Sequence, residues 1–324
     1  MTAREWGRFV PDEIVRELAA ATSVGAVGHV GPDGDALGSI LGLTLAARAA
    51  GKEAYASFGE PFTLTENFDY LDRSTLVPPS EFPEGLDVVV ACDTAARSRL
   101  GSIVDRVETA HRLIVVDHHR SNGGFGDLEW IDPEAAATAQ MIFHLLRRLT
   151  WPVDRSAATA LYTGIITDTG RFQYSSMTPD VHLIAAELLA AGVRQDLVAE
   201  KLFEEAPFGY YRVVSNVMGR AVLEAEIGLV WSVLYHADLD EAGIRYEDTD
   251  GLIDLVRIAR EAGVACLLKE RDSGLIKGSL RSRGRIDVAA IAATFGGGGH
   301  HNAAGFTFEG TVDEAMARVR AALS

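Results

Sequence analysis

Three short, almost wholly aliphatic segments constrain the fold of this chain more than any other feature of its sequence. They lie at residues 24–28, 88–92 and 113–116. Near-continuous apolar runs are typical of parallel strands that helices cover on both faces. Helical patterns are expected around them, at 11–21, 36–50, 134–150, 154–166 and 178–191. The sequence therefore predicts an α/β fold whose first domain is a doubly wound parallel sheet.

Four clusters of histidine and aspartate each come where an apolar strand-type segment is expected to end. They are His29 with Asp33 and Asp35, then Asp93, then Asp117 with His118 and His119, and finally Asp168. Open α/β sheets present their functional groups at the carboxyl ends of the strands. We therefore expect the four clusters to share one edge of the sheet.

Four carboxylates in one pocket would repel one another strongly. They belong to Asp33, Asp35, Asp93 and Asp168. One pair of unit charges ~5 Å apart costs roughly 3 kcal/mol at an effective dielectric constant of ~20. Protonation would require pKa values far above the usual ~4, whereas two divalent cations would balance the charge. Carboxylates and imidazoles without a thiolate suit Mn²⁺ better than a structural zinc ion, so we expect two divalent ions, Mn²⁺ first among them.

Each cluster also has an ordinary structural explanation. Asp93 could cap a helix, and Gly34, between two aspartates, could belong to a turn. The Asp117-His118-His119 triplet could be a turn with solvated imidazoles. The recurrence of one strand-end context in all the clusters favours a shared site instead.

Length and composition favour an intracellular globular protein of two domains. The chain has 324 residues, enough for two hydrophobic cores. Its beginning leads into an amphipathic stretch at 11–18 rather than an apolar signal segment. No apolar run reaches the ~18 residues of a membrane span. Cys92 and Cys266 lie in apolar segments, where buried thiols without a disulfide are expected. We expect a cytoplasmic protein that does not contact a membrane.

The charge of the chain restricts its partners. A net charge of −16 argues against a protein that coats long nucleic acid, which needs a broad basic surface, but it does not exclude short nucleotides. The charge balance reverses between Lys269 and Arg285, a stretch that contains six basic and two acidic residues. That stretch is either a solvated strand face or a site for an anion.

A second, smaller α/β domain is predicted at 225–324, after a first domain at 1–194 and a helical connector at 195–224. Its strands are expected at 229–234, at 264–268 and up to residue 282, and its helices at 250–262, 287–294 and 312–323. Four consecutive glycines, at 296–299, precede His300 in a predicted loop. Such a run loses much conformational entropy on folding, and its ordered use is to let backbone N–H groups approach an anion. A flexible linker is the alternative, although regular segments lie close on both sides.

Together these motifs resemble the DHH phosphoesterase family, named after the triplet at 117–119. The resemblance covers nearly the whole chain and includes His29-x-x-Pro-Asp33-Gly-Asp35, Asp93-Thr94, Thr167-Asp168-Thr169-Gly170-x-Phe172, Ser279-x-Arg281-Ser282 and the glycine run followed by Ala303-Ala304-Gly305. The last two resemble the substrate-binding domain associated with DHH proteins. In size and two-domain plan the chain is most similar to the family's oligoribonucleases that also act on pAp.

This resemblance implies a function. We expect a Mn-dependent enzyme that cleaves very short 5′-phosphorylated oligoribonucleotides, such as pApA, to nucleoside 5′-monophosphates, and pAp to AMP and phosphate. The expected step is attack by a hydroxide bridging two ions, which breaks a P–O3′ bond. A phosphodiesterase specialised for pApA or cyclic di-AMP and a non-catalytic nucleotide sensor are the alternatives. A homodimer is also implied.

The resemblance also assigns roles to residues. It places one metal on His29, Asp33 and Asp93, and the second on Asp35, Asp93, His118 and Asp168. Asp93 would bridge the ions, and it forms the catalytic set with His118 and with His119, which would lie beside the reacting phosphoryl group. Asp117 would orient an imidazole. The substrate's terminal phosphate or base would be bound by Arg281, Gly296, Gly297, Gly298, Gly299 and His300. The role of His301 is left open.

Overall fold

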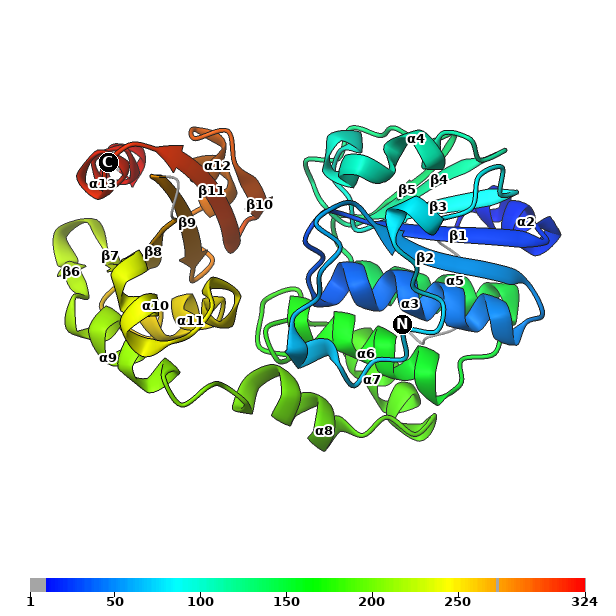
Figure 1. Ribbon diagram of the computed structural model, residues 1–324, viewed down its shortest axis with the longest axis horizontal. Coiled ribbons are helices and arrows are strands. Elements are labelled where there is room, and N and C mark those ends of the chain that lie inside the picture. Colours follow the sequence, from blue (N-terminus) through cyan, green and yellow to red (C-terminus); the bar gives the residue numbers. More distant parts are fainter. Residues whose placement is uncertain (1–9, 272–273, 324) are drawn as a thin grey trace. The chain divides into compact units, whose positions relative to one another are not determined.

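The chain divides into two compact units, Met1–Leu202 and Phe203–Ser324, each with its own sheet (Figure 1). The structure is a computed structural model that describes residues 10–271 and 274–323. The start of the chain, where no signal segment is expected, lies outside these residues. The boundaries at 194 and 224 stay predictions. Within the described ranges, no helix combines the length and apolarity needed to cross a bilayer.

The first unit contains a sheet of five parallel strands, in the order β2-β1-β3-β4-β5. The strands are β1 Ser23–Gly28, β2 Glu53–Phe58, β3 Val88–Cys92, β4 Leu113–Asp117 and β5 Leu128–Ile131. The prediction of a parallel α/β sheet is confirmed, and β1, β3 and β4 fall on the three aliphatic segments. The chain enters at β1 and continues to opposite sides of it, so the β1–β3 boundary is the switch point where such sheets bind ligands.

Helices cover this sheet on both faces (Figure 1). The helices of the first unit are α2 Asp12–Ala20, α3 Gly34–Ala49, α4 Val104–Val107, α5 Thr138–Leu149, α6 Arg155–Asp168, α7 Pro179–Ala190 and α8 Gln195–Ala199. Of these, α3, α4 and α5 pack on the sheet, whereas α6 and α7 pack on other helices. Helix α3 packs on β1 and β2 with one side and on α6 with the other. It is buried from residue 34 to residue 47, which explains why its sequence is apolar all round rather than amphipathic.

Glycines spaced four residues apart bring α6 close to α3. A Cβ on Gly38 would lie 2.4 Å from the backbone oxygen of Ala160, and one on Gly42 would lie 2.6 Å from Leu161 Cδ2. One turn earlier, a Cβ on Gly34 would lie 2.4 Å from Thr167 Oγ1. Because Thr167 directly precedes Asp168, this close contact fixes the position of that aspartate relative to α3.

The Gly38→Ala substitution is therefore expected to destabilise the first unit. The new methyl group meets backbone rather than a movable side chain, so the helices must separate, at a cost of about 2 kcal/mol. Urea unfolding followed by circular dichroism measures this cost. Gly28→Ala is the matched control, because Gly28 is also buried but its Cβ would meet nothing closer than 3.4 Å. Equal stability of the two variants would contradict the close-packing argument.

The second unit contains a six-stranded mixed sheet, in the order β10-β11-β9-β8-β7-β6. The strands are β6 Val222–Glu224, β7 Leu229–Leu234, β8 Val264–Glu270, β9 Leu275–Ser282, β10 Gly298–His300 and β11 Ala303–Glu309. Among the described pairs only β7–β8 is parallel. One face packs on α9 Tyr210–Gly219, α10 His236–Ala242 and α11 Leu252–Val256, the other on α12 Val288–Ala293 and α13 Val312–Leu323. The predicted smaller α/β domain is confirmed.

Three local predictions were wrong. The helix expected at 250–262 is shorter in the structure: α11 ends at Val256, and Ile258 beyond it is 72% exposed. The predicted glycine loop is partly strand, since Gly298 and Gly299 belong to β10. The connector at 195–224 is helical in α8 and α9 but ends in the strand β6. Cys92 and Cys266 are buried thiols, as expected.

Candidate metal centre

His29 is the first residue after β1, and its side chain faces two aspartates. Its Nε2 lies 3.9 Å from Asp33 Oδ2 and 3.9 Å from Asp93 Oδ2. Its Nδ1 lies 3.0 Å from the backbone oxygen of Val30, and because a carbonyl oxygen only accepts, Nδ1 carries the hydrogen. In its neutral form the ring would therefore direct the Nε2 lone pair towards the carboxylates, as a metal-binding histidine requires.

The two aspartates at the start of α3 have different surroundings. Asp33 is the N-cap, and its Oδ1 accepts hydrogen bonds from the N–H groups of Asp35 and Ala36, both at 3.1 Å. The buried Asp35 carboxylate accepts from Thr138 N at 2.6 Å and Ala139 N at 2.9 Å. These N–H groups begin α5, where the helix dipole favours a negative charge. The N-terminus of α5 therefore holds Asp35 in place.

Asp93 follows β3 and lies between two histidines. Its Oδ1 is 3.5 Å from His118 Nε2, and its Oδ2 is 3.9 Å from His29 Nε2. Its φ is +53°, a left-handed conformation uncommon for residues other than glycine and often found at functional sites. The conformation is held by the Asp93 N–H, which donates to Val116 O at 3.0 Å, and by Thr138 Oγ1, which donates to Asp93 Oδ1 at 3.0 Å.

His118 follows β4, and its Nε2 is surrounded by three carboxylates. The distances are 3.3 Å to Asp168 Oδ2, 3.5 Å to Asp93 Oδ1 and 3.7 Å to Asp35 Oδ2. Its Nδ1 lies 3.0 Å from Ala135 O, so in its neutral form this ring would have the same tautomer as His29. Asp168 was expected to follow a strand, and this prediction was wrong. It is the last residue of the helix α6. It reaches the same carboxylate group because α6 packs against α3.

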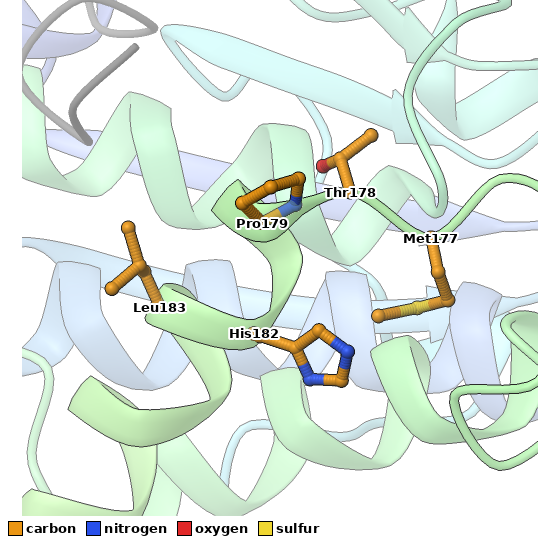
Figure 2. Close-up of a pocket in the computed structure, with 5 residues that line it drawn as sticks. All are labelled: Met177, Thr178, Pro179, His182 and Leu183. Atoms are coloured by element: carbon orange, nitrogen blue, oxygen red, sulfur yellow. The ribbon is translucent and has the colours of Figure 1, made fainter.

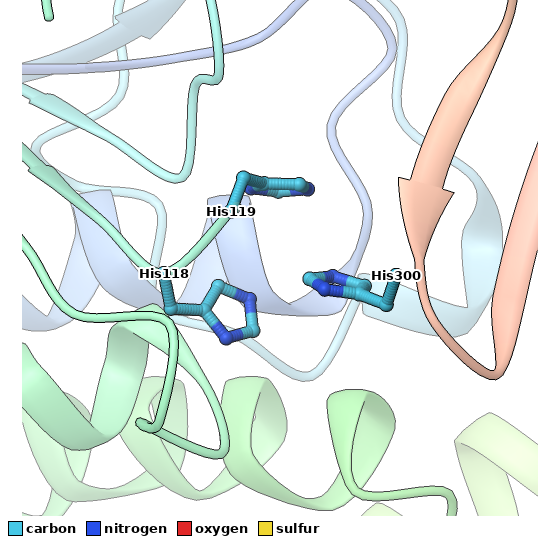
Figure 3. Close-up of side chains that lie close together, drawn as sticks. All are labelled: His118, His119 and His300. Atoms are coloured by element: carbon cyan, nitrogen blue, oxygen red, sulfur yellow. The ribbon is translucent and has the colours of Figure 1, made fainter. Parts of the chain in front are cut away.

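His119 is oriented by a buried aspartate of its own triplet. Its Nδ1 lies 2.8 Å from Asp117 Oδ1, while Asn122 Nδ2 donates to Asp117 Oδ2 at 2.7 Å. Figure 3 shows the His118 and His119 rings, which leave the main chain at adjacent positions after β4 and have differently oriented planes. Their centroids are 5.3 Å apart and their planes are inclined by 72°. The Nδ1 atoms of the two rings contact different groups, Asp117 for His119 and Ala135 O for His118, although both rings come within 3.6 Å of Asp93 Oδ1.

Two residues of this centre were missed by the sequence analysis. Thr138 bonds to both Asp35 and Asp93, and Asn122 holds Asp117. The helix containing Thr138 was predicted to begin at residue 134, which hid the position of its first N–H groups. Asn122 had no signal beyond its closeness to the triplet.

In the second unit, Arg281 and His300 lie in one row across three strands. Arg281 on β9 is opposite Ala303 on β11, which is opposite His300 on β10. Directly opposed residues of antiparallel strands share a face, so both side chains lie on one face about 10 Å apart. The Arg281 Nε is 3.9 Å from Asp254 Oδ1.

Part of the glycine run is explained by packing within the hairpin. A Cβ on Gly297 would lie 2.2 Å from Gly305 O, and one on Gly299 would lie 2.5 Å from Ala303 O. The φ of Gly299 is also +141°, which L side chains rarely adopt. A Cβ on Gly298, in contrast, would meet no atom within 4 Å. Only part of the run is therefore left for ligand contact.

The comparisons with known proteins agree with this geometry. Residues 23–165 match the N-terminal domain of the DHH family, and residues 227–324 match the DHHA1 domain. The bifunctional oligoribonuclease and PAP phosphatase NrnA of Thermus thermophilus is 38% identical over 295 residues, which are 90% of this chain and 86% of that protein. This chain belongs to the DHH family. It is a metal-dependent hydrolase of the phosphoesterase class.

Two further similarities concern the whole DHH–DHHA1 arrangement. The cyclic-di-AMP phosphodiesterase GdpP of Geobacillus thermodenitrificans is 30% identical over 341 residues, which are 95% of this chain but 48% of that protein. The crystal structure of an exopolyphosphatase-related protein from Bacteroides fragilis superposes with a TM-score of 0.87 at 27% identity, covering 96% of this chain and 94% of that one. Both similarities therefore extend over the two units of this chain.

Without bound metal, four ionisable groups of this centre have pKa values above their usual range. Burial raises the pKa of Asp35 well above its usual range, and the charge of Asp93 adds to this. Burial and the charge of Asp33 raise the pKa of Asp93 to about 6. Burial alone would lower the pKa of His29 and of His118, but the surrounding carboxylates raise each to about 9. The centre therefore holds protons that bound cations would displace.

The donor atoms of the DHH unit fit divalent cations. Three groups have ligand atoms within 4.8 Å of one another: His29 with Asp33 and Asp93, Asp35 with His118 and Asp168, and Asp93 with Asp117 and His119. The first two contain one imidazole nitrogen and two carboxylates each, and Asp93 joins them. Both imidazoles donate their other N–H to a backbone carbonyl, an outer contact typical of metal ligands.

A separate hollow of about 580 Å³ lies beside α7 (Figure 2). Its walls are Met177, Thr178, Pro179, His182 and Leu183. None of these five was predicted as a site residue, and they contain one ionisable group, the imidazole of His182. The residues that line the hollow therefore include one imidazole but no carboxylate, and the centre around Asp93 is the better candidate for phosphoester hydrolysis.

Proposed function

We propose that this protein hydrolyses very short 5′-phosphorylated oligoribonucleotides, such as pApA, to nucleoside 5′-monophosphates, and pAp to AMP and phosphate. Both reactions break a bond between phosphorus and O3′, so one centre can serve both. The observation that carries the proposal is the meeting of two histidine–carboxylate groups at Asp93. The Thermus relative, whose name gives both activities, supports the substrate class.

We assign the metal ligands by these contacts. The first ion would be held by His29, Asp33 and Asp93, and the second by Asp35, Asp93, His118 and Asp168. Mn²⁺ is the proposed metal, because oxygen and imidazole donors without a thiolate suit it. Bound cations would supply an activated water molecule and stabilise the charge that grows on the phosphate oxygens.

His119 is the proposed proton donor. As a water oxygen bonds to phosphorus and the P–O3′ bond breaks, the departing O3′ needs a proton. Burial would lower the pKa of His119, but its hydrogen bond to Asp117 and the charge of Asp93 raise it. The ring is therefore held in one orientation and retains a proton at higher pH than an ordinary histidine. Asp117, itself held by Asn122, acts through His119.

The DHHA1 unit would bind the substrate's terminal phosphate or base. Arg281 and His300 project from one face of its sheet, and the row between them contains only Ala303. A small residue there leaves the two polar side chains accessible from the same side. The exposed Gly298 lies two residues before His300 on β10, opposite Gly305, and its N–H group can approach an anion without a side chain in the way.

Substitutions at two glycines of β10, Gly298 and Gly299, distinguish an effect on substrate binding from an effect on folding. Gly298→Ala is expected to raise the KM for pApA roughly tenfold, because a methyl group would intrude where the ligand approaches, worth about 1.4 kcal/mol. Its melting temperature should stay at the wild-type value, since its Cβ meets no protein atom. Gly299→Ala, the control, should instead destabilise the unit. A normal KM for Gly298→Ala would remove the glycine run from the substrate site.

The main test is a substrate series measured with Mn²⁺. AMP release is followed from pAp and from 5′-phosphorylated oligoadenylates of increasing length, beginning with pApA. We expect the fastest turnover with pApA and the shortest oligomers, and clear release of AMP from pAp. Faster cleavage of long chains would contradict the proposal, and so would an absence of turnover with every substrate.

A cyclic dinucleotide phosphodiesterase is the second candidate. It is favoured by the similarity to the cyclic-di-AMP phosphodiesterase GdpP, although this chain spans only about half of that protein. Cyclic di-AMP is therefore included in the same series. If its kcat/KM exceeds that of pApA, this second candidate replaces the first.

A further inference from the structure

Three proposed metal ligands are held by one short stretch, residues 135–138, which we term the 135–138 segment. Ala135 O accepts from His118 Nδ1 at 3.0 Å. Thr138 N donates to Asp35 at 2.6 Å, and Thr138 Oγ1 donates to Asp93 at 3.0 Å. A shift of this segment would therefore move ligands of both proposed ions together.

The 135–138 segment is held in turn by a buried polar network. Gln140, in the first turn of α5, accepts a hydrogen bond from Ala136 N at 2.8 Å through its Oε1. Its Nε2 donates to Asp180 Oδ2 at 3.0 Å, and His144 Nε2 lies 3.0 Å from the same oxygen. Gln140, His144 and Asp180 are each no more than 4% exposed. We term these three residues the Gln140 network.

The hydrogen-bonding groups of this network fit in only one direction. A carboxylate accepts hydrogen bonds but does not donate them, so the NH₂ group of Gln140 must face Asp180. Its carbonyl oxygen must then face Ala136 N–H. The side chain of Gln140 is thereby fixed at both ends, between α7 and the 135–138 segment.

This arrangement is costly for the fold. Buried polar groups are expensive unless all their bonds are made. Among the residues that the structure describes, Asp180 Oδ1 is buried and has no hydrogen-bond partner. Apolar side chains would join α5 and α7 more cheaply. A network that costs stability and ends on the backbone beside three ligands is better explained by its effect on those ligands.

We propose that Gln140 is a positioning residue for the metal centre, with Asp180 and His144 holding it in place. It fixes the 135–138 segment and, through it, the distances among His118, Asp35 and Asp93. This inference rests on the proposed metal ligands of the centre. It does not depend on which nucleotide is the substrate.

The experiment measures Mn²⁺ binding to the 324-residue chain, with the concentration of free Mn²⁺ determined by electron paramagnetic resonance. Gln140→Leu, of similar size, removes both hydrogen bonds and is expected to weaken Mn²⁺ binding at least tenfold. Ile142→Val is the matched control, because Ile142 is a fully buried residue of the same helix that belongs to the apolar core. It should lower the melting temperature slightly and leave Mn²⁺ affinity unchanged.

A double variant that exchanges the donor and acceptor groups of residues 140 and 180 should restore Mn²⁺ binding. Gln140→Glu alone places a carboxylate against Asp180 and should weaken Mn²⁺ binding. Adding Asp180→Asn supplies an NH₂ group where the carboxylate was, so the bond re-forms with its direction reversed. The double variant is expected to bind Mn²⁺ within about threefold of the wild type, a non-additive result that a double-mutant cycle detects.

Two outcomes would overturn the proposal. One is a Gln140→Leu protein that binds two Mn²⁺ ions with wild-type affinity. The other is a double variant no better than Gln140→Glu. Failure of the proposed function is distinguishable, because the wild type would then cleave neither pApA nor pAp while the Mn²⁺ affinities still followed the expected order.

Discussion

Replacing Asp93 by asparagine is expected to reduce kcat by roughly a thousandfold, which corresponds to about 4 kcal/mol of lost transition-state stabilisation. The reason is that its two oxygens face different histidines, His118 at 3.5 Å and His29 at 3.9 Å. Both proposed ligand groups therefore lose a charged member at once. Asparagine is chosen because it tolerates the left-handed conformation at this position better than alanine does.

Loss of activity in Asp93→Asn should not reflect loss of the fold. Removing one charge relieves repulsion among crowded carboxylates, so the melting temperature of the metal-free variant should equal or exceed that of the wild type. Asp132→Asn is the matched control, since Asp132 directly follows β5 at the same edge of the sheet but lies in none of the three ligand groups, and asparagine can still accept the hydrogen bond from Glu134 N. Turnover of Asp93→Asn within tenfold of Asp132→Asn would contradict the two-metal assignment.

The sheet and its histidine–aspartate edge could be predicted because their signals are local. An aliphatic run needs no partner to be recognised as a buried strand, and the residues after it must lie at the strand's end. His29, Asp93 and His118 were found in this way. Their mutual distances follow from the parallel order of β1, β3 and β4, which places three strand ends side by side.

The position of Asp168 could not be predicted from a strand end. It ends a helix rather than a strand, and it reaches His118 only because glycines let α6 pack tightly on α3. Its sequence motif pointed to the site, but nothing local to it indicated the helix packing. The contacts of Thr138 and Gln140 had no local signal either, since they depend on where α5 begins. A helix boundary misplaced by four residues moves every N–H group at its first turn.

The glycine run illustrates a pattern with two physical causes. Four glycines indicated close approach of the backbone to something, and a phosphate was the natural candidate. In the structure, Gly297 and Gly299 make room for the backbone of β11, while Gly298 faces open space. Sequence alone shows that a side chain is excluded. It does not show whether protein or ligand excludes it.

Metal should stabilise the first unit strongly, and more strongly at higher pH. A ligand that binds only the folded state adds about 4 kcal/mol for each site at a free concentration a thousand times its Kd. Two such sites should raise the melting temperature by more than roughly 10 °C. Treatment with EDTA should remove the whole increment, and Asp93→Asn should retain less than half of it.

The pH dependence follows from the protons that the metal-free centre holds. The folded-state pKa of Asp93 is raised to about 6, and those of His29 and His118 to about 9. A raised pKa stabilises the fold below the unfolded value, and this contribution is lost as pH rises through the folded value. The metal-free melting temperature should therefore fall between pH 5.5 and 8.

Mn²⁺ must displace these same protons, so its increment should grow over that range. Differential scanning fluorimetry at pH 5.5 and pH 8, with Mn²⁺ or with EDTA, measures both trends. The melting temperatures with and without Mn²⁺ should therefore diverge as the pH rises. If Mn²⁺ raised the melting temperature equally at pH 5.5 and at pH 8, the cation would bind elsewhere than in the protonated centre around Asp93.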